Sequence, residues 1–564
     1  MDRRIRQIAA LITVLLIAVT ISAGWVQGIR AEQIASYEPA DPHHPGERAR
    51  NIFRIYEECR WERGPILSID GQVLAESRLA APGHRCKYDR NYPAGDLAPH
   101  VVGQWSLYFG KTGLESAYNA DLVGQPPPAK TLAEVFQERP RVGDTLVSTI
   151  DTRLQKAAVQ ALAGRRGGIV ALNPKTGAVL VAASVPSYDP NGLASNDRIT
   201  ALQARCSLGL GFRLDDQGNT VRNSRGEPVL CSNPNSPLLS VALQAQRPPG
   251  SSFKVVTAAA ALESGKYTPG YPYVPSRGAY TPPGDVIAIH NFGGGVCGGN
   301  ITEDLRVSCN TAFAQIANDI GAGPFLATAQ AMGFDSVSGS GFVGCDGGPV
   351  SDIDLTHVGC LPSEFDRRDA KGNVVARETL TTPGYRSRAG FGQWVIQASP
   401  FGMALVAATV GNGGFVPRPR FAERVINREG QTVREIRTGI GPAAISPKTA
   451  GELAQMMRGV VTGGTAASAF SGFPIPVAGK TGTAQQPTCS SDEAAIFGPG
   501  CGRLPHAWFI AFAPVQDPTI AIAVLIERGG GNNEEATGGH VAAPVAVQVL
   551  QKYFELYPVP RGGQ

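Results

Sequence analysis

The sequence predicts an α/β protein, and three features support that class. Two pairs of apolar, strand-like runs lie far apart in the chain, at residues 167–184 and 506–526. Between them, an alanine-rich run of good helix formers follows Pro248, Pro249 and Gly250. The 564 residues can form two or three domains with a large core. A 43% hydrophobic and 17% charged composition is typical of a globular protein.

Residues 8–29 are expected to cross a membrane. As a helix this apolar run would be about 33 Å long, enough for a bilayer core. Arg3, Arg4 and Arg6 precede it, so the positive-inside rule keeps residues 1–7 in the cytoplasm and the remainder outside. A cleaved signal peptide is the alternative, but the run is long for one and residues 21–23 match a cleavage site poorly.

Charge and cysteine content restrict the remaining functions. A net charge of +4 gives no electrostatic case for nucleic-acid binding. Ten cysteines agree with an oxidising compartment. Metal binding is the alternative, but no C-x-x-C or H-x-x-x-H spacing occurs, so neither a metal nor a cofactor is expected. The order of the cysteines suggests local disulfides, although sequence alone leaves the connectivity open: Cys59 with Cys86, Cys206 with Cys231, Cys297 with Cys309, Cys345 with Cys360, and Cys489 with Cys501.

The N-terminal third contains no group of residues suited to nucleophilic catalysis. Residues 31–60 are polar and proline-bearing and are expected to form a linker or a loose entry segment. Residues 61–147 mix short strand-like pieces with turn signals, and the prolines at 126–128 exclude regular structure there.

Buried hairpins and irregular insertions alternate in the rest of the chain. Residues 167–172 and 178–184 predict one hairpin, and 506–512 and 519–526 predict another. Residues 202–235 are expected to form a surface insertion closed by Cys206 and Cys231, and 335–388 are expected to be irregular. A C-terminal helix with one apolar face is predicted over 541–557.

Ser251 is the candidate nucleophile. The turn-forming Pro248-Pro249-Gly250 places it in the first turn of the predicted helix, where Lys254 lies three residues on and can meet its hydroxyl. The free N–H groups and dipole of that turn favour negative charge beside the serine. An isolated S-x-x-K is more often a helix cap, so the pattern needs further support.

That support comes from the order of two further triplets. Ser308-Cys309-Asn310 is the one S-x-N of the chain, and Lys480-Thr481-Gly482 follows it. K-T-G occurs twice more, at 111–113 and 175–177, where turns are the simpler interpretation. The third copy continues into Thr483 and is preceded by small residues, which suits a strand edge lying against a ligand.

The S-x-x-K, S-x-N and K-T-G set resembles that of the penicillin-binding proteins. The resemblance extends from the membrane segment almost to the C-terminus. Residues 63–75 and 110–115 look like signatures of a class B pedestal, and 149–155 look like the entry to a transpeptidase domain.

This resemblance implies a fold and a division into domains. It implies a penicilloyl-serine transferase (β-lactamase-like) fold, in which both chain ends build one antiparallel sheet with helices on both sides and an all-helical subdomain. Residues 30–147 would form the pedestal and 148–560 the transpeptidase domain. Residues 390–393 and 398–404 resemble a segment that packs and shapes the cleft, so Gln393 is assigned a structural role.

The resemblance also implies roles for the individual motif residues. Ser251 would attack a D-alanyl carbonyl, and Lys254 would take its proton if burial and Lys480 lower the lysine pKa. Ser308 would pass a proton to the departing D-alanine, and Asn310 would hold Lys254 and the substrate amide.

Substrate binding is assigned to the third triplet and the residue after it. Backbone N–H groups of Ser251 and Thr483 would stabilise the oxyanion, and Thr481, Gly482 and Thr483 would line the substrate's carboxylate end. The implied ligands are peptidoglycan stem peptides ending in D-Ala-D-Ala and β-lactam antibiotics. A glycan polymerase of the SEDS type (shape, elongation, division and sporulation) in the membrane is the implied partner.

Two other functions remain possible from the sequence. A serine β-lactamase shares the triplets, although no dedicated water-activating residue is identifiable. A catalytically inactive scaffold or antibiotic receptor is the third possibility.

The sequence leaves the state of the Cys309 thiol open. Cys309 lies inside the S-x-N triplet, where a disulfide to Cys297 would stiffen the loop and a free thiol would be open to oxidation.

Overall fold

The computed structural model describes residues 58–559, together with Thr13 and Leu15. The predicted cytoplasmic tail and membrane helix therefore lie outside the described residues, apart from those two positions. Within the described part, no helix is both long and apolar enough to cross a membrane. The gaps in the described range are 84–85, 125–139, 216, 335–350, 354–355, 357, 369–373, 394–395, 438, 486–490, 498–500 and 531–535.

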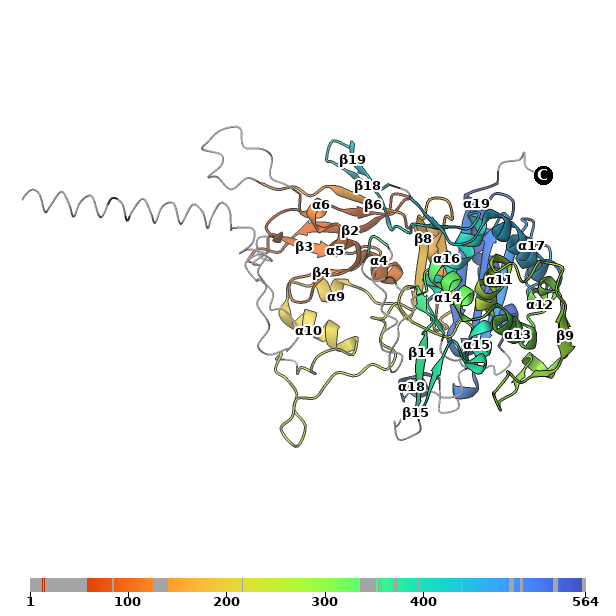
Figure 1. Ribbon diagram of the computed structural model, residues 1–564. Coiled ribbons are helices and arrows are strands. Elements are labelled where there is room, and N and C mark those ends of the chain that lie inside the picture. The colour runs from red at the N-terminus through yellow and green to blue at the C-terminus, as the bar shows by residue number, and fades with distance from the viewer. Residues whose placement is uncertain are drawn as a thin grey trace, which may run out of the picture.

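A five-stranded antiparallel sheet lies at the centre of the larger part of the molecule (Figure 1). Its order is β21-β22-β23-β7-β8, so strands from both halves of the chain meet where β23 pairs with β7. Every residue of β7, β22 and β23 is buried, which explains their unbroken apolar runs. Both predicted hairpins and the sheet built from distant segments are confirmed. The strands are β7 (Gly167–Leu172), β8 (Val179–Val185), β21 (Ala478–Ala484), β22 (His506–Ala513) and β23 (Ile520–Ile526).

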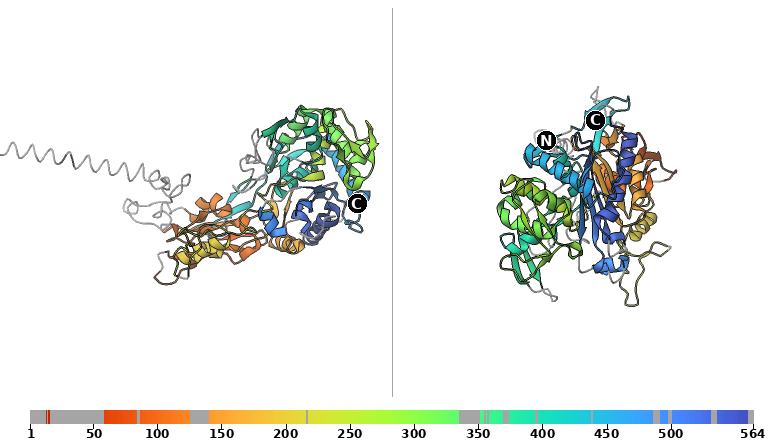
Figure 2. Two further views of the ribbon diagram at one scale, coloured as in Figure 1. Left: turned by 90° about the horizontal axis from the view of Figure 1, so that it is seen from below. Right: turned by 90° about the vertical axis from the view of Figure 1, so that its right-hand side faces the viewer.

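Helices cover both faces of this sheet, as Figure 2 shows. On one face, α16 packs on β7, β22 and β23, and α17 packs beside β21. On the other face α8 and α19 pack against each other, and the Tyr553 hydroxyl of α19 donates to the Thr519 carbonyl over 3.1 Å. The predicted C-terminal helix is confirmed and is preceded by a π-helical turn, η6. These helices are α8 (Thr152–Leu162), α16 (Pro400–Gly411), α17 (Pro447–Gly463), η6 (Gly538–Ala542) and α19 (Ala543–Leu556).

The expected helical subdomain is present but is not all-helical. Short strand pairs accompany its helices, and residues 335–388 are not wholly irregular, because β14 and β15 form a hairpin within them and α15 follows. Charged residues in both strands hid their alternation in the sequence. The helices are α11 (Lys254–Glu263), α12 (Ile301–Arg306), α13 (Asn310–Ile320), α14 (Ala322–Ala331) and α15 (Pro383–Gly390), and the strands are β9 (Val274–Arg277), β10 (Ala279–Tyr280), β11 (Ile289–His290), β12 (Cys297–Gly299), β14 (Glu364–Arg368) and β15 (Val374–Thr379).

A second, six-stranded sheet combines four strands from the N-terminal part of the described chain with β18 and β19 from beyond residue 420, in the order β19-β18-β6-β1-β2-β3. Strand β6 spans the expected domain boundary at 147–148 and pairs parallel with β1 and antiparallel with β18. The sheet therefore combines residues from both expected domains. Its strands are β1 (Ile66–Leu67), β2 (Val73–Leu79), β3 (Tyr88–Asn91), β6 (Thr145–Ser148), β18 (Ala422–Ile426) and β19 (Thr432–Glu435).

Helices and short strand pairs complete the framework. Beside the N-terminal sheet lie η1 (Gly95–Leu97), α4 (Pro99–Val102), β4 (Trp105–Ser106), β5 (Gly110–Lys111), α5 (Gly113–Ala117) and α6 (Asn119–Val123). The remaining elements are α9 (Asn191–Ala194), α10 (Arg198–Ser207), η3 (Phe292–Gly294), β13 (Gly359–Cys360), β16 (Gln397–Ala398), β17 (Phe415–Pro417), β20 (Ile440–Ala443), α18 (Ser491–Phe497), η4 (Cys501–Arg503) and η5 (Glu527–Gly530).

Three of the suggested disulfides are present: Cys59–Cys86, Cys206–Cys231 and Cys297–Cys309. Cys360 and Cys501 are also disulfide-bonded, but their suggested partners Cys345 and Cys489 lie outside the described residues.

The insertion closed by Cys206 and Cys231 lies beside the N-terminal part of the molecule (Figure 1). The guanidinium of Arg205 lies 4.8 Å from the centre of the Phe109 ring. Although the insertion directly precedes the candidate nucleophile in the chain, it extends away from it in space.

A buried charge cluster joins the N-terminal sheet to α5. Glu115 is fully buried and accepts hydrogen bonds from Arg63 Nε and Arg90 Nε, each over 2.6 Å. The Tyr92 hydroxyl donates to the same carboxylate over 3.2 Å. The two guanidinium charges hold the pKa of Glu115 below its usual value although burial acts in the opposite direction.

We predict that Glu115→Gln destabilises the protein by about 3–5 kcal/mol, because two buried arginines lose their counter-charge. Thermal and urea unfolding measure the loss. Glu555→Gln is the control, because its ion pair with Lys552 is exposed and is worth about 0–1 kcal/mol. Equal losses in the two variants would contradict this account of the cluster.

Candidate active site

Ser251 lies in a 3₁₀ turn, η2 (Gly250–Phe253), and α11 begins directly after it at Lys254. Ser251 is half-buried, whereas Lys254 is fully buried. Gly250 has φ +54°, a left-handed conformation that suits glycine. The Trp508 indole donates to the Pro248 carbonyl over 2.9 Å, which ties the entry of the turn to β22. The predicted turn and helix are therefore present, with the serine in the 3₁₀ part.

Strand β21 lies at the edge of the central sheet and against η2. A Cβ atom on Gly482 would lie 2.6 Å from the Pro249 carbonyl oxygen and 3.0 Å from the Ser252 nitrogen. A Cβ on Gly250 would lie 2.6 Å from the Thr483 carbonyl oxygen. The two backbones can therefore approach this closely only because glycine occupies both positions. The third K-T-G copy lies on a strand edge, as expected.

The Lys254 amine makes three hydrogen bonds to described residues. It donates to the Ser308 carbonyl over 2.6 Å, to Asn310 Oδ1 over 2.8 Å and to Ser308 Oγ over 3.2 Å. Among the described residues no hydrogen bond joins it to the Ser251 hydroxyl, which the spacing in the sequence predicted it could meet. The amine is directed instead to acceptors of the S-x-N triplet, one of which is the expected Asn310.

Ser308 Oγ lies between the two lysines. Lys480 Nζ donates to it over 2.9 Å and to the Thr481 carbonyl over 2.9 Å. Ser308 has φ +62°, a sparsely populated conformation for a residue other than glycine and one often found at functional sites. The structure therefore brings the three predicted triplets together at one place.

Both lysine amines are removed from water. Burial and the nearby Lys480 charge lower the pKa of Lys254 well below its ordinary value. Burial lowers the pKa of Lys480 to about 7. A neutral amine beside a hydroxyl can accept a proton, which is the requirement for a serine acyl transfer.

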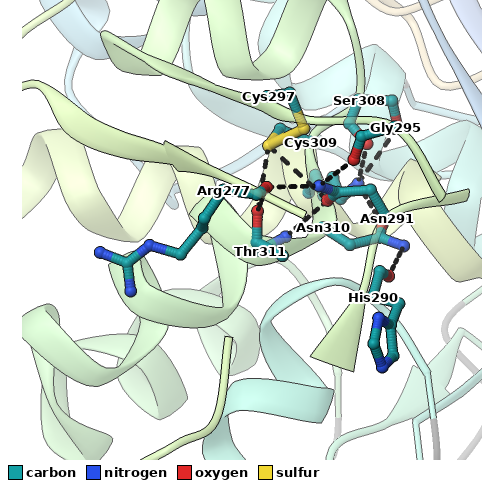
Figure 3. Close-up of a disulfide and its surroundings, with 10 residues drawn as sticks. Arg277, His290, Asn291, Gly295, Cys297, Ser308, Cys309, Asn310 and Thr311 are labelled. Atoms are coloured by element: carbon teal, nitrogen blue, oxygen red, sulfur yellow. Dashed lines mark hydrogen bonds between the residues drawn. A yellow bond between two sulfur atoms is a disulfide. The ribbon is translucent and has the colours of Figure 1, made fainter. Parts of the chain in front are cut away.

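The Cys297–Cys309 disulfide fixes the loop that carries Ser308 and Asn310 (Figure 3). Asn310 Nδ2 donates to the His290 carbonyl over 3.1 Å. Asn291 accepts from the Thr311 N–H over 3.0 Å and donates to the Gly295 carbonyl over 2.9 Å. Of the two states that the sequence left open for Cys309, the structure shows the disulfide to Cys297.

The residues around the third triplet are also interconnected. The hydroxyls of Thr481 and Thr465 lie 2.5 Å apart, and Thr483 Oγ1 accepts from the Gly538 N–H over 3.3 Å. Gln393 Nε2 donates to the Thr483 carbonyl over 3.1 Å, which agrees with its predicted structural role.

Sequence reasoning missed Thr465 and Asp304. Thr465 lies in an irregular segment after α17, and no local pattern connects it with Thr481. Asp304 occupies the apolar side of α12 together with Ile301 and Leu305, and all three residues are fully buried. An acid on an apolar helical stripe, one turn before Ser308, was the signal that could have identified it.

Comparisons with known proteins agree with this geometry. Residues 167–551 match the penicillin binding protein transpeptidase domain, and residues 63–145 match the penicillin binding protein A dimerisation domain. The peptidoglycan D,D-transpeptidase PbpA of Mycolicibacterium smegmatis is 33% identical over 558 residues, which is 97% of each chain. PbpA of Mycobacterium tuberculosis is 32% identical over 576 residues, covering 99% of this chain and 100% of that protein.

Solved structures show the same relationship. The penicillin G acyl-enzyme complex of penicillin-binding protein A from M. tuberculosis matches with a TM-score of 0.69 and 30% identity. The match covers 88% of this chain and 100% of that one.

We predict that Gly482→Ala lowers the rate of covalent penicillin labelling at least about 100-fold, because the new methyl group pushes the turn carrying Ser251 away from β21. Stopped-time labelling with a fluorescent penicillin measures the rate. The control is Gly451→Ala on α17, where a Cβ meets no atom within 4 Å and labelling should stay normal. Wild-type labelling in Gly482→Ala would show that the close approach is dispensable.

Proposed function

Because the chain belongs to the penicillin-binding protein transpeptidases, we propose that Ser251 forms the acyl-enzyme with which this peptidoglycan D,D-transpeptidase cross-links stem peptides. The observation that supports this assignment is the convergence of Lys254 and Lys480 on Ser308 Oγ, beside the turn of Ser251. The protein also binds penicillin covalently.

In the proposed acylation, neutral Lys254 takes the Ser251 proton as Oγ bonds to the carbonyl carbon of the penultimate D-alanine. The tetrahedral intermediate then collapses with cleavage of the C–N bond. Ser308 passes a proton to the departing amine of the terminal D-alanine and is replenished by the lysines hydrogen-bonded to it. The products are free D-alanine and an ester on Ser251.

The edge position of β21 suits an extended peptide, because its outer backbone groups can pair with another strand. Backbone N–H groups of Ser251 and Thr483 are proposed to stabilise the oxyanion, each worth roughly 3–4 kcal/mol in comparable enzymes. Lys480, Thr481 and Thr483 are proposed to bind the terminal carboxylate, which a β-lactam also carries, and Gly482 lets β21 approach the turn.

In the second half-reaction, an amine of another stem peptide attacks the Ser251 ester. A new amide bond forms, the ester bond breaks, and Ser251 Oγ recovers its proton. A β-lactam follows only the first half, because its leaving amine remains attached by the opened ring. The acyl-enzyme then persists.

We predict that Ser251→Ala abolishes both fluorescent-penicillin labelling and D-alanine release from a stem-peptide substrate, because no other hydroxyl replaces the nucleophile. Gel fluorescence and a D-alanine assay measure the two losses. Ser264→Ala, at the far end of α11, is the control and should retain both activities. Labelling that survives in Ser251→Ala would reassign the nucleophile, and rapid turnover of the label in the wild type would favour a β-lactamase.

Anchoring and partnership are further parts of the proposal. The apolar run at 8–29 after three arginines supports a single membrane span with the catalytic domain outside the cytoplasm. As the resemblance implies, a SEDS-type polymerase in the same membrane is the proposed partner, and residues 30–147 are the proposed pedestal.

We predict that deletion of residues 1–30 releases the protein from the membrane without loss of penicillin labelling, because the catalytic residues lie elsewhere in the chain. Fractionation of cells followed by labelling measures both properties. Persistent membrane association of the truncated protein would contradict the anchor, and failure of the full chain to co-purify with a SEDS polymerase would contradict the partnership.

A further inference from the structure

Asp304 is a buried acid that the reaction described above does not use. It lies on α12, one helical turn before Ser308, and its backbone carbonyl accepts from the Cys309 N–H over 2.8 Å. Its side chain is 0% exposed. The residue is therefore built into the loop that presents the S-x-N triplet.

Neither carboxylate oxygen of Asp304 has a hydrogen-bond partner in the described part of the protein. A buried carboxyl group without partners is costly, because water no longer solvates it. A small apolar residue such as alanine would avoid this cost. An electrostatic role would explain why an acid occupies this buried position.

The charge that acts on Asp304 most favourably is the Lys254 amine. The two groups interact electrostatically, and this interaction raises the pKa of Lys254 and lowers that of Asp304. Burial dominates at the acid and raises the pKa of Asp304 to about 7. The charge of Glu303, on the same helix, raises the pKa of Asp304 slightly. The charge of Asp304 in turn contributes to the raised pKa of the Tyr267 hydroxyl.

Other charged side chains around α12 are directed elsewhere. Arg306 pairs with Glu303. On α17, which packs against α12, Lys448 lies 4.0 Å from Glu452 and Arg458 is exposed. On α13, Asp319 is exposed and accepts from the Tyr267 hydroxyl.

We propose that Asp304 is a positioning residue for acyl transfer, which acts through Lys254 by stabilising the ammonium formed when that amine takes the Ser251 proton. This inference rests on the proposed function of Lys254 as the base. In the described residues, no hydrogen bond joins the carboxylate of Asp304 to Ser251. When ionised, it supplies a negative charge inside a site that otherwise holds two buried amines.

The effect on the reaction has a defined sign. A nearby negative charge favours the protonated form of Lys254, so it raises the pKa of that amine and makes it a stronger base. Removing the charge lowers this pKa. Neutral Lys254 would then persist to lower pH, but each neutral amine would accept the Ser251 proton less readily.

The test is the pH dependence of acylation in Asp304→Asn, measured as the second-order rate constant of fluorescent-penicillin labelling between pH 5 and pH 10 at constant ionic strength. We expect the part of the acid limb above pH 7 to move down by about one pH unit, because Asp304, with a pKa of about 7, is ionised there and the variant lacks that charge. The plateau should fall roughly tenfold, because the base is weaker. Asp304→Glu keeps the charge and should restore most of both properties.

Glu303→Gln is the matched control, because it removes an acid from the neighbouring position of the same helix, where the side chain is 42% exposed. Its profile should coincide with that of the wild type. If Asp304→Asn does not fold, Asp304→Ala gives the same readout without a buried polar group. Thermal unfolding establishes that each variant is folded.

An unshifted acid limb in a folded, neutral variant would overturn the proposal. Loss of folding in both neutral variants would also overturn it, because the acid would then support the fold rather than the amine. Either result leaves the transpeptidase function intact. Absence of labelling in the wild type, in contrast, would remove the proposed function itself.

Discussion

The site depends on two lysine amines buried around one serine hydroxyl. Lys254 and Lys480 both donate to Ser308 Oγ, and neither side chain is exposed to water. Burial lowers the pKa of both amines, and the nearby Lys480 charge lowers that of Lys254 further. The fold thereby supplies amines that can be neutral near physiological pH, as a proton acceptor for a serine requires. Asp304 is the nearby acid that acts on Lys254 in the opposite direction.

Backbone approach keeps these groups in place. The turn of Ser251 lies against β21 so closely that Gly250 and Gly482 have no room for a side chain. The S-x-N loop is held separately, by the Cys297–Cys309 disulfide and by hydrogen bonds of Asn291 and Asn310. Three segments from distant parts of the chain are therefore fixed by packing, pairing and a covalent link. Rigid support of this kind keeps the reacting groups in place, and even small displacements of these groups would lower the reaction rate.

The N-terminal part is joined to the larger part through shared backbone pairing. Strand β6 connects β1 with β18, which comes from far along the chain. Asp70 accepts from the N–H and the hydroxyl of Thr152, at the first turn of α8. Two parts connected through a common sheet and by hydrogen bonds at a helix start are expected to move together.

Much of this molecule could be predicted from local patterns. Unbroken apolar runs identified β7, β8, β22 and β23, because strands that are buried on both faces do not alternate between polar and apolar residues. Proline and glycine before an alanine-rich run located the turn of Ser251 and helix α11. Local cysteine order gave three disulfides that the described residues contain. The charged hairpin of β14 and β15 escaped detection, because its alternation lacks an apolar face.

Sequence alone determined which residues could perform the chemistry, because S-x-x-K, S-x-N and K-T-G are short, local and ordered along the chain. Tertiary structure decided how they meet. It directed the hydrogen bonds of the Lys254 amine to Ser308 and Asn310 rather than to Ser251, and it buried Asp304 with no hydrogen-bond partner for its carboxylate in the described residues. It also extended the N-terminal sheet with β18 and β19 from beyond residue 420. Each of these outcomes depends on the distance between groups remote in the chain, and residue order does not encode that distance directly.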